Sequence, residues 1–415
     1  MKMQGEKKIK VLTLNCMVNE GSTSKIINDI ANCTKDECEF FQCYQIGEKS
    51  SGNNYRVSSW NVTRFYFLLA RIVGLKYGVG NYPTRKLLRY IDKINPDIVH
   101  IHCPNFYSIN LYRLFSHLKK KQYKVVITNH AEFFYTGNCA YAKECEGYQT
   151  GCKKCNRVFD EKHKYLLNRT HAEWKKMKQA FWGADNFLMT VVSPWQKERI
   201  KTSPITENMK VKVVENGVNT DIFKKKEPDM KKYEVYRESG RKIILNVTSN
   251  FSDNIEDTKG GYYLLEVARK MPENLFLVAG NTHMTKKENL PPNVILLGNV
   301  KNQEELADYY NLADLTIVTS KRETFGMSLA ESMACGTGVV GFKAGGTESV
   351  AIQEYSEFVE FKEVDGLVHL IKKWQDKKPF IQDDLANKAA LKYSTQRMAK
   401  EYLTIYKEML AEKEQ

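Results

Sequence analysis

The chain has no apolar run long enough to cross a membrane. Its longest candidate, residues 65–75, is interrupted by Arg71, whereas a spanning helix needs about 20 predominantly apolar residues. The basic N-terminus leads into residues 9–18, which contain Lys10 and Asn15 and are followed by no small-residue cleavage site. This stretch predicts a first strand rather than a signal peptide, and we expect a cytoplasmic protein.

Acidic residues are scarce in the first half of the chain. Residues 1–240 hold 41 Lys and Arg against 24 Asp and Glu, a net charge of +17, whereas residues 241–390 carry −4 and residues 391–415 carry +1. Such a bias is typical of an anionic partner, namely a nucleic acid, an acidic membrane face or a phosphorylated substrate, or else of a soluble Lys-rich surface.

The 415 residues are 42% hydrophobic and 27% charged, which excludes wholesale disorder and predicts two domains. Apolar, β-branched runs alternate with helical patterns in both halves, as in doubly wound α/β sheets. In the first half these runs are 9–15, 97–102, 124–130 and 187–193; in the second they are 242–247, 275–279, 294–297, 315–319 and 338–342. A charged, low-apolar stretch after Asn216-Gly217 predicts a linker, so we divide the chain into 1–218, 219–390 and a C-terminal helical segment, 391–415.

Residues 320–336 carry the most informative pattern. A predicted strand ends there, a loop holds Glu323, and a helix begins near Phe325-Gly326 and contains Glu331. The N–H groups at a helix start can hold a phosphate, and ionised carboxylates accept hydrogen bonds from sugar hydroxyls. The alternative is an amphipathic helix with two solvated glutamates.

This Glu-x7-Glu element does not stand alone. Gly345-Gly-Thr-Glu348 follows it, and Thr258-Lys259-Gly260 and the segment 215–223 precede it. In this order, over nearly the whole chain, the set resembles the retaining GT-B glycosyltransferases of family 4. The resemblance implies two Rossmann-like domains facing across a cleft.

The resemblance also implies a site for a nucleoside-diphosphate sugar, a UDP-sugar in preference to a GDP-sugar, in the second domain. Glu323 would hold sugar hydroxyls, Glu331 the ribose, and Lys259 the diphosphate. The phosphate and sugar would be lined by Phe325, Gly326, Met327, Gly345, Gly346 and Asn250. Many members carry an Arg shortly before the Lys, whereas this chain has Val247-Thr-Ser-Asn-Phe251 there. Lys259 is then the only motif cation, unless Lys321, Arg322 or a residue of the first domain compensates.

In the first domain, His130 ends a predicted strand, and the resemblance implies that it contacts the transferred sugar. His102, with His100 two residues earlier, is an alternate. A buried structural histidine is the other interpretation. Gly21 and Ser22 follow the first strand and are candidates for the acceptor side through their backbone amides.

Four cysteines, two of them in a Cys-x2-Cys pair, fall within a span of 17 residues that follows His130: Cys139, Cys145, Cys152 and Cys155. Four thiolates at this spacing predict a structural zinc, although the first pair is wider than usual. Reduced loop cysteines and disulfides are the alternatives. We expect this loop, 139–155, to shape the acceptor pocket.

The resemblance implies an enzyme that retains the anomeric configuration and needs no catalytic metal; the chain has no Asp-x-Asp. The acceptor would be a saccharide or a lipid-linked saccharide, in surface polysaccharide or glycoconjugate synthesis. The alternatives are a GT-B-fold epimerase and a basic nucleic-acid-binding protein; we expect no nucleic acid, because no stacking motif is present.

Residues 60–89 mix aromatic and aliphatic side chains with arginines and lysines. Such a segment predicts either contact with an anionic membrane surface or a core helix with a basic outer face. Peripheral attachment to the inner face of the membrane would bring the enzyme to lipid-linked acceptors.

Overall fold

The structure is a computed structural model that describes residues 7–155, 165–228, 230–237, 240–285, 287–376 and 382–412. The chain forms two compact units, Met1–Val214 with Ala399–Gln415, and Glu215–Met398. The boundary predicted from the sequence is at residue 218, whereas this division falls after Val214. No described helix has both the length and the apolar character that a membrane crossing requires.

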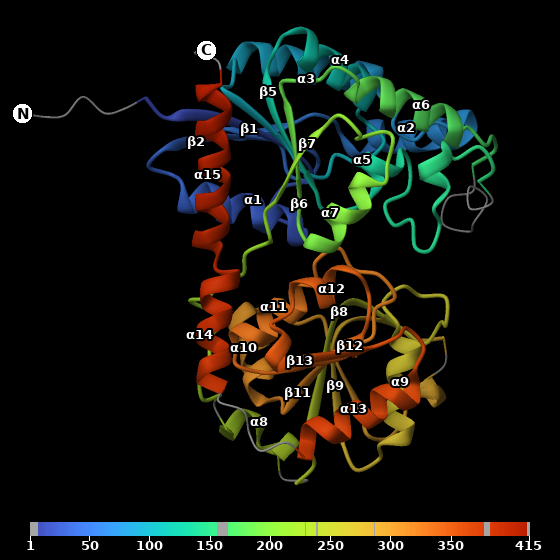
Figure 1. Cartoon of the computed structure of the whole chain (residues 1–415), viewed down its shortest axis with the longest axis vertical. Helices are drawn as coiled ribbons and strands as arrows, with labels where there is room; N and C mark the ends of the chain where they lie inside the picture. Colours follow the sequence, from blue (N-terminus) through green and yellow to red (C-terminus); the bar gives the residue numbers. More distant parts are fainter. Residues whose placement is uncertain are drawn as a thin grey trace, which may run out of the picture. The chain divides into compact units, whose positions relative to one another are not determined.

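The first unit is built on a parallel sheet in the order β3-β2-β1-β4-β5-β6-β7 (Figure 1). Its strands are β1 (Ile9–Met17), β2 (Cys38–Ile46), β3 (Asn54–Arg56), β4 (Ile98–Ile101), β5 (Lys124–Asn129), β6 (Phe187–Val191) and β7 (Lys210–Val213). Strands β4 and β6 are entirely buried, which explains their continuous apolar sequences.

The helices of this unit begin at recognisable caps. Ser59, Asn110 and Ser193 each accept a hydrogen bond from the first turn of the helix that follows. These helices are α1 (Gly21–Cys33), α2 (Trp60–Val73), α3 (Asn81–Ile94), α4 (Leu111–Lys120), α5 (Phe133–Thr136), α6 (Thr170–Phe181) and α7 (Pro194–Lys201), with a 3-10 turn, η1 (Gly147–Thr150).

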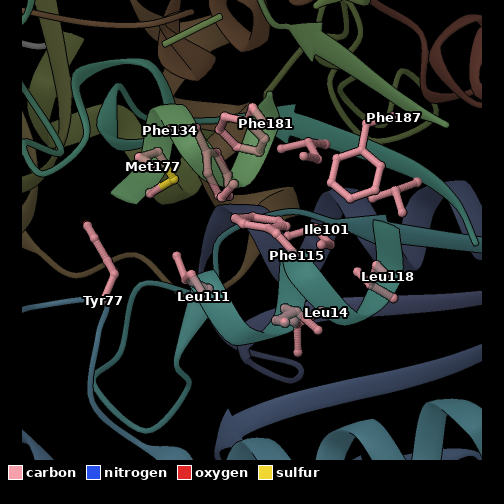
Figure 2. Close-up of a cluster of buried hydrophobic side chains, with 14 of the residues drawn as sticks. Leu14, Tyr77, Ile101, Leu111, Phe115, Leu118, Phe134, Met177, Phe181 and Phe187 are labelled. Atoms are coloured by element: carbon pink, nitrogen blue, oxygen red, sulfur yellow. The ribbon is translucent and has the colours of Figure 1, made fainter. Parts of the chain in front are cut away.

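Helices α4 and α6 pack on this sheet through a large apolar core. The rings of Phe134, Phe181 and Phe187 each contact the ring of Phe115, which lies beside Ile101 in Figure 2. Burying aromatic side chains of this size contributes roughly 2–3 kcal/mol each. The core therefore fixes β4 and β5, whose carboxyl ends carry the histidines.

The second unit repeats the plan with the order β10-β9-β8-β11-β12-β13, again all parallel. Its strands are β8 (Ile243–Ser252), β9 (Leu275–His283), β10 (Val294–Gly298), β11 (Leu315–Val318), β12 (Val339–Phe342) and β13 (Ser356–Val359). Two doubly wound sheets confirm the predicted architecture.

Helices cover both faces of this second sheet. Helix α9 packs against α13, and α11 packs against α10 and α14 (Figure 1). The elements are α8 (Met230–Arg237), α9 (Gly261–Lys270), α10 (Gln303–Leu312), α11 (Met327–Ala334), α12 (Gly346–Val350), α13 (Val364–Asp376), α14 (Gln382–Tyr393) and α15 (Thr395–Ala411), with 3-10 turns η3 (Lys287–Asn289) and η4 (Gln353–Tyr355).

Helix α15 contributes to the core of the first unit from Ala399 onward. The Tyr402 hydroxyl lies 2.9 Å from the Thr128 hydroxyl of β5, and the Tyr406 hydroxyl lies 2.7 Å from Nδ1 of His100 on β4. These buried polar contacts tie the end of the chain to the first sheet.

Candidate functional site

Each sheet has one point at which the order of its strands reverses, and the candidate residues lie beside this point. In the second unit the reversal lies between β8 and β11. Ligands of doubly wound sheets bind beyond the carboxyl ends of the strands at such a reversal. The loop from β8 to α9 carries Lys259 and Gly260, and the segment after β11 carries Glu323.

Gly260 allows these two segments to meet. Its φ of +70° is a left-handed conformation, and a Cβ atom there would lie 1.9 Å from the Thr319 carbonyl oxygen. The Lys321 N–H donates to the Thr258 carbonyl at 2.8 Å. The β8 loop and the end of β11 are therefore fastened side by side.

Lys259 and Glu323 form an ion pair, with Nζ 2.7 Å from Oε1. Both side chains are partly exposed, at 26% and 19%. The backbone of Glu323 bonds to the glycine turn as well, because its N–H donates to Ala344 O and its carbonyl accepts from Gly346 N. The residues predicted to hold the diphosphate and the sugar hydroxyls and the predicted glycine turn thus come together in one unit.

The glycine turn lies directly against the start of α11. A Cβ on Gly346 would lie 2.2 Å from the Thr324 carbonyl oxygen, so only glycine fits. The Glu348 carboxylate accepts from the N–H groups of Ala344 and Gly345 at 2.9 Å, which holds the turn. Gly326, with φ +93°, caps α11, and the hydroxyl of Thr347 beside it is buried with no hydrogen-bond partner among the described residues.

The other residues predicted to line the phosphate and the sugar have different surroundings. Phe325 is buried and packs edge-on against Tyr393, while Met327 is the first residue of α11. Asn250 is exposed on the outer half of β8, where it pairs with Asn281 of β9. Lys321 lies over the Phe361 ring, with Nζ 5.4 Å from the ring centroid.

Glu331 lies on α11 and is held by a residue that the sequence analysis missed. The hydroxyl of Tyr310, a fully buried side chain on α10, donates to Glu331 Oε2 at 3.0 Å. Burial and the Glu331 charge raise the pKa of Tyr310 well above its usual value, so this donor keeps its proton. In sequence Tyr310 is one aromatic residue of a helix, and nothing in its spacing indicates this contact.

In the first unit the strand order reverses between β1 and β4. Gly21 and Ser22 begin α1 just after β1; both are exposed, and nothing lies within 4 Å of the Gly21 Cβ position. His102 follows β4, and His130 follows β5, the next strand of the sheet. These four residues occupy the carboxyl edge of the first sheet.

The three histidines form a continuous stack. His102 Nδ1 lies 3.0 Å from His130 Nε2, and the rings of His100 and His102 are 3.9 Å apart. Burial lowers the pKa of His130 to about 4 and holds those of His100 and His102 well below the usual range. All three are neutral at pH 7, and Nε2 of His102 is buried without a hydrogen-bond partner among the described residues.

The zinc prediction is not supported by the geometry. Among the described residues no three His, Cys, Asp or Glu form a group that could hold a metal ion, so Cys139, Cys145, Cys152 and Cys155 do not make such a site. Burial and the neighbouring thiols raise the pKa of Cys152 to about 12.

A buried carboxylate anchors this loop instead. Glu132, completely buried, accepts from Arg199 Nε and the Tyr135 hydroxyl at 2.8 Å, and from the backbone N–H of Ala142 in the loop. A charged group buried in this way must be paired, and here each partner is a donor. Glu132 is not predictable from the sequence, because it follows His130 without any motif of its own.

Two family models match consecutive parts of the chain. The model described as Glycosyltransferase Family 4 matches residues 59–222, and Glycosyl transferases group 1 matches residues 237–392. The chain belongs to the family 4 glycosyltransferases. The second match contains all the residues that meet around Lys259, and the first contains the histidine stack.

Two relatives of this glycosyltransferase share between a fifth and a third of their aligned residues with it. A putative colanic acid biosynthesis glycosyl transferase, WcaC, of Escherichia coli is 23% identical over 80% of both chains. A probable sucrose-phosphate synthase of Thermosipho melanesiensis is 27% identical over 59% of this chain and 58% of its own length. Among solved structures, Anabaena Alr3699/HepE, in complex with UDP and in another structure with UDP-glucose, shows the same GT-B fold; the UDP complex has a TM-score of 0.66 and 14% identity, over 96% of this chain and 100% of its own.

Proposed function

We propose that this glycosyltransferase moves a sugar from a nucleoside-diphosphate sugar, with UDP as the favoured nucleotide, to a saccharide or lipid-linked acceptor. The product would be part of a surface polysaccharide or related glycoconjugate. The observation that carries the proposal is the meeting of Lys259, Glu323 and the glycine turn beside the start of α11. The UDP complexes of the similar Anabaena protein support the choice of nucleotide.

The geometry suits each part of such a donor. Lys259 and the positive end of α11 offer charge and N–H groups to the diphosphate. Glu331, held by Tyr310, is oriented to accept from a ribose diol. In this proposal Glu323 accepts from sugar hydroxyls, and the Thr347 hydroxyl, which has no hydrogen-bond partner among the described residues, donates to a phosphate or sugar oxygen of the bound sugar nucleotide.

In this proposal the leaving diphosphate is stabilised without a metal. Lys259 exchanges Glu323 for the diphosphate when the donor binds, and preorganised donors of this kind stabilise the charge that develops on the leaving oxygen. The reaction retains the anomeric configuration, with the departing phosphate oxygen taking the acceptor proton. Neutral His130 contacts the transferred sugar through a hydrogen bond rather than a charge.

Thermal unfolding with UDP, UDP-sugars, GDP and GDP-sugars tests the donor site, because a ligand that binds only the native state raises its stability. We expect UDP compounds to raise Tm for the unaltered chain and not for Glu331→Ala. Glu354→Ala removes an exposed carboxylate elsewhere in the same unit and should behave like the unaltered chain. Equal shifts for all three proteins would remove the proposed site, and NMR of the product anomer checks retention.

We further propose that the outer face of α2 contacts an anionic membrane surface. Trp60, Phe65, Leu68 and Ile72 are each more than half exposed on this helix. Arg64 is exposed on the same helix. Apolar residues flanked by cations are typical of helices that lie in a membrane interface.

The structure corrects one part of the predicted membrane segment. Lys76 is only 6% exposed and does not belong to the outer surface of α2. Flotation with liposomes containing acidic phospholipid tests the remaining face. We expect Phe65→Ser with Leu68→Ser to abolish flotation, whereas Leu391→Ser, a change at an exposed leucine of α14, leaves it intact. Flotation unchanged by the double substitution would exclude this surface.

A further inference from the structure

His102 is a buried histidine to which the proposed mechanism gives no role. It directly follows β4, and its side chain is 0% exposed. Its backbone N–H donates to the Leu14 carbonyl at 2.9 Å, across the point where the first sheet reverses its strand order. Nε2 of its ring is buried without a hydrogen-bond partner among the described residues. The role of His102 therefore depends on its other ring nitrogen, Nδ1.

Nδ1 of His102 forms a hydrogen bond with His130. It lies 3.0 Å from Nε2 of His130, and the two rings are inclined by only 14°, with their centroids 5.3 Å apart. Burial lowers the pKa of both histidines, so each ring is neutral at pH 7 and carries one proton. A neutral imidazole donates at one nitrogen and accepts at the other. One of these two rings is therefore the donor of the bond between them.

The unpartnered nitrogen of His102 indicates the direction of this bond. If His130 donated, the proton of His102 would be on Nε2, as a buried N–H group with no acceptor among the described residues. Buried N–H groups without a partner are rarer in folded proteins than unpaired acceptors, and each one loses its hydrogen bond to water. The arrangement that avoids this cost places the proton of His102 on Nδ1, where it donates to His130 Nε2.

His100 fixes the ring of His102 from the other side. The centroids of these two rings are 3.9 Å apart. His100 is itself held by the hydroxyls of Tyr406 and Thr128, each 2.7 Å from one of its ring nitrogens. His102 is thus a preorganised donor, set in place before any sugar binds.

His130 is the member of the stack that a sugar can reach. It follows β5 and is partly exposed, whereas His100 and His102 are completely buried. The hydrogen bond at one nitrogen of an imidazole determines which nitrogen carries the proton. With Nε2 accepting from His102, the proton of neutral His130 is on Nδ1.

We propose that His102 is a positioning residue that holds the proton of His130 on Nδ1, so that His130 donates a hydrogen bond to an oxygen atom of the transferred sugar. This inference rests on the proposed transferase function and specifies the chemical state of one residue of its site. In this state both nitrogens of His130 are committed, so it does not act as a base. The acceptor proton then goes to the departing phosphate oxygen, as in the proposed reaction.

Long-range ¹H–¹⁵N NMR spectra of the ¹⁵N-histidine-labelled, otherwise unaltered chain show which ring nitrogens carry protons. The chain has eight histidines, and the spectra of His102→Asn and His130→Gln assign the two signals. If either variant does not fold, substituting the other histidines assigns them by elimination. At pH 7 we expect the proton on Nδ1 in both His102 and His130. A proton on Nε2 of His130 would overturn the proposal.

Steady-state sugar transfer tests the consequence for the reaction. His102→Leu removes the donor, and we expect kcat to fall by about tenfold, the equivalent of one hydrogen bond, with the affinity for UDP unchanged. His102→Asn places an amide N–H near the position of Nδ1 and should retain most of the turnover. His117→Leu, at a histidine of α4 that pairs with Asp92, is the matched control and should behave like the unaltered chain.

Two kinetic results would contradict the positioning role: an unaltered kcat in His102→Leu, or the same loss in His102→Asn as in His102→Leu. The NMR experiment needs no substrate and is therefore independent of the assay. If no UDP-sugar is turned over while the proton is on Nδ1 of His130, the result counts against the transferase function alone.

Discussion

At the scale of single residues, the central contact is the ion pair between Lys259 and Glu323. Both side chains are partly open to water, and such pairs contribute roughly 0.2–1 kcal/mol. In the proposed reaction, a donor diphosphate would therefore displace Glu323 from Lys259 at little cost. The displaced carboxylate is then available to the sugar that the diphosphate carries.

This exchange predicts opposite effects of Glu323→Gln on binding and on turnover. Removing the competing carboxylate should tighten UDP binding about two- to fivefold, the equivalent of the ion pair it releases. Sugar transfer should fall by roughly 100-fold or more, since a charged hydrogen-bond acceptor is lost. Calorimetry with UDP and a transfer assay measure the two effects; weaker UDP binding by Glu323→Gln would contradict the exchange.

Gly260 gives a second prediction at this scale. Gly260→Ala places a Cβ 1.9 Å from a backbone oxygen, in addition to the cost of a left-handed alanine. We expect a loss of about 3 kcal/mol or more in the free energy of unfolding, and loss of UDP binding. Gly298→Ala has a similar φ, +74°, with nothing within 4 Å of the new Cβ, and should lose only about 1 kcal/mol in urea denaturation. Equal losses would contradict the steric argument.

Most residues of this candidate site could be predicted from the sequence, but the residues that hold them in place could not. Lys259, Glu323 and the glycine turn lie in short motifs with a recognisable order. Tyr310 and Glu132 act through contacts across 21 residues and up to 67 residues of sequence, respectively. Only the folded chain shows such contacts, because the residue types themselves are ordinary at those positions.

At the scale of elements, the histidine stack joins two strands and a helix. His100 on β4 lies between the Tyr406 hydroxyl of α15 and the Thr128 hydroxyl of β5, each 2.7 Å from a ring nitrogen. His100 and His102 are neutral, and burial disfavours the charged form of each ring, so adding a proton to either histidine destabilises the folded chain. The stack should therefore make the first unit sensitive to acid.

The sign of this effect follows from the lowered pKa values. The pKa of His130 falls from 6.5 to about 4 on folding, so between these pH values the unfolded chain binds more protons. The free energy of unfolding then decreases as pH falls from 6.5, by about 2 kcal/mol between pH 7 and pH 5 for His130 alone. Urea denaturation at several pH values measures it.

His130→Gln should lose this part of the pH dependence, whereas His369→Gln, at an exposed histidine of α13, should follow the unaltered chain. The comparison between variants is needed because Glu173 acts in the opposite direction. Its pKa is raised to about 7 on folding, so its contribution to stability decreases as pH rises from 4.5 toward 7. Identical profiles for His130→Gln and the unaltered chain would contradict the prediction.

Strand prediction succeeded where burial dictates composition and failed at three of the four sheet edges, β10 being the edge strand that was found. The central strands β4, β5, β6 and β11 are runs of apolar residues that the sequence analysis found. The missed strands are the edge strands β3, β7 and β13 and the inner strand β2 beside β3, all of which mix polar with apolar residues. An edge strand is specified by the neighbour it pairs with, which its own sequence does not contain.

At the scale of the whole molecule, the chain leaves the first unit at Val214 and contributes to it again from Ala399. The returning residues pack on the first sheet: the side chains of Tyr402 and Tyr406 are buried and form hydrogen bonds with side chains of β5 and β4, respectively. The second unit, Glu215–Met398, is continuous in sequence. Stability of the first unit therefore depends on the last residues, while that of the second does not.

A chain ending at Met398 should show this difference. Loss of α15 beyond that point uncovers β4 and β5 and removes the Tyr406 partner of His100 Nδ1 and the Tyr402 partner of Thr128, at a cost of roughly 1–3 kcal/mol for a group left unpaired. We expect hydrogen exchange to become fast throughout residues 7–214, with protection retained in the second unit and with UDP still bound. Tyr402→Phe with Tyr406→Phe keeps the apolar cover and should accelerate exchange only moderately. Loss of protection first in residues 240–376 would show instead that the second unit is the one that depends on α15.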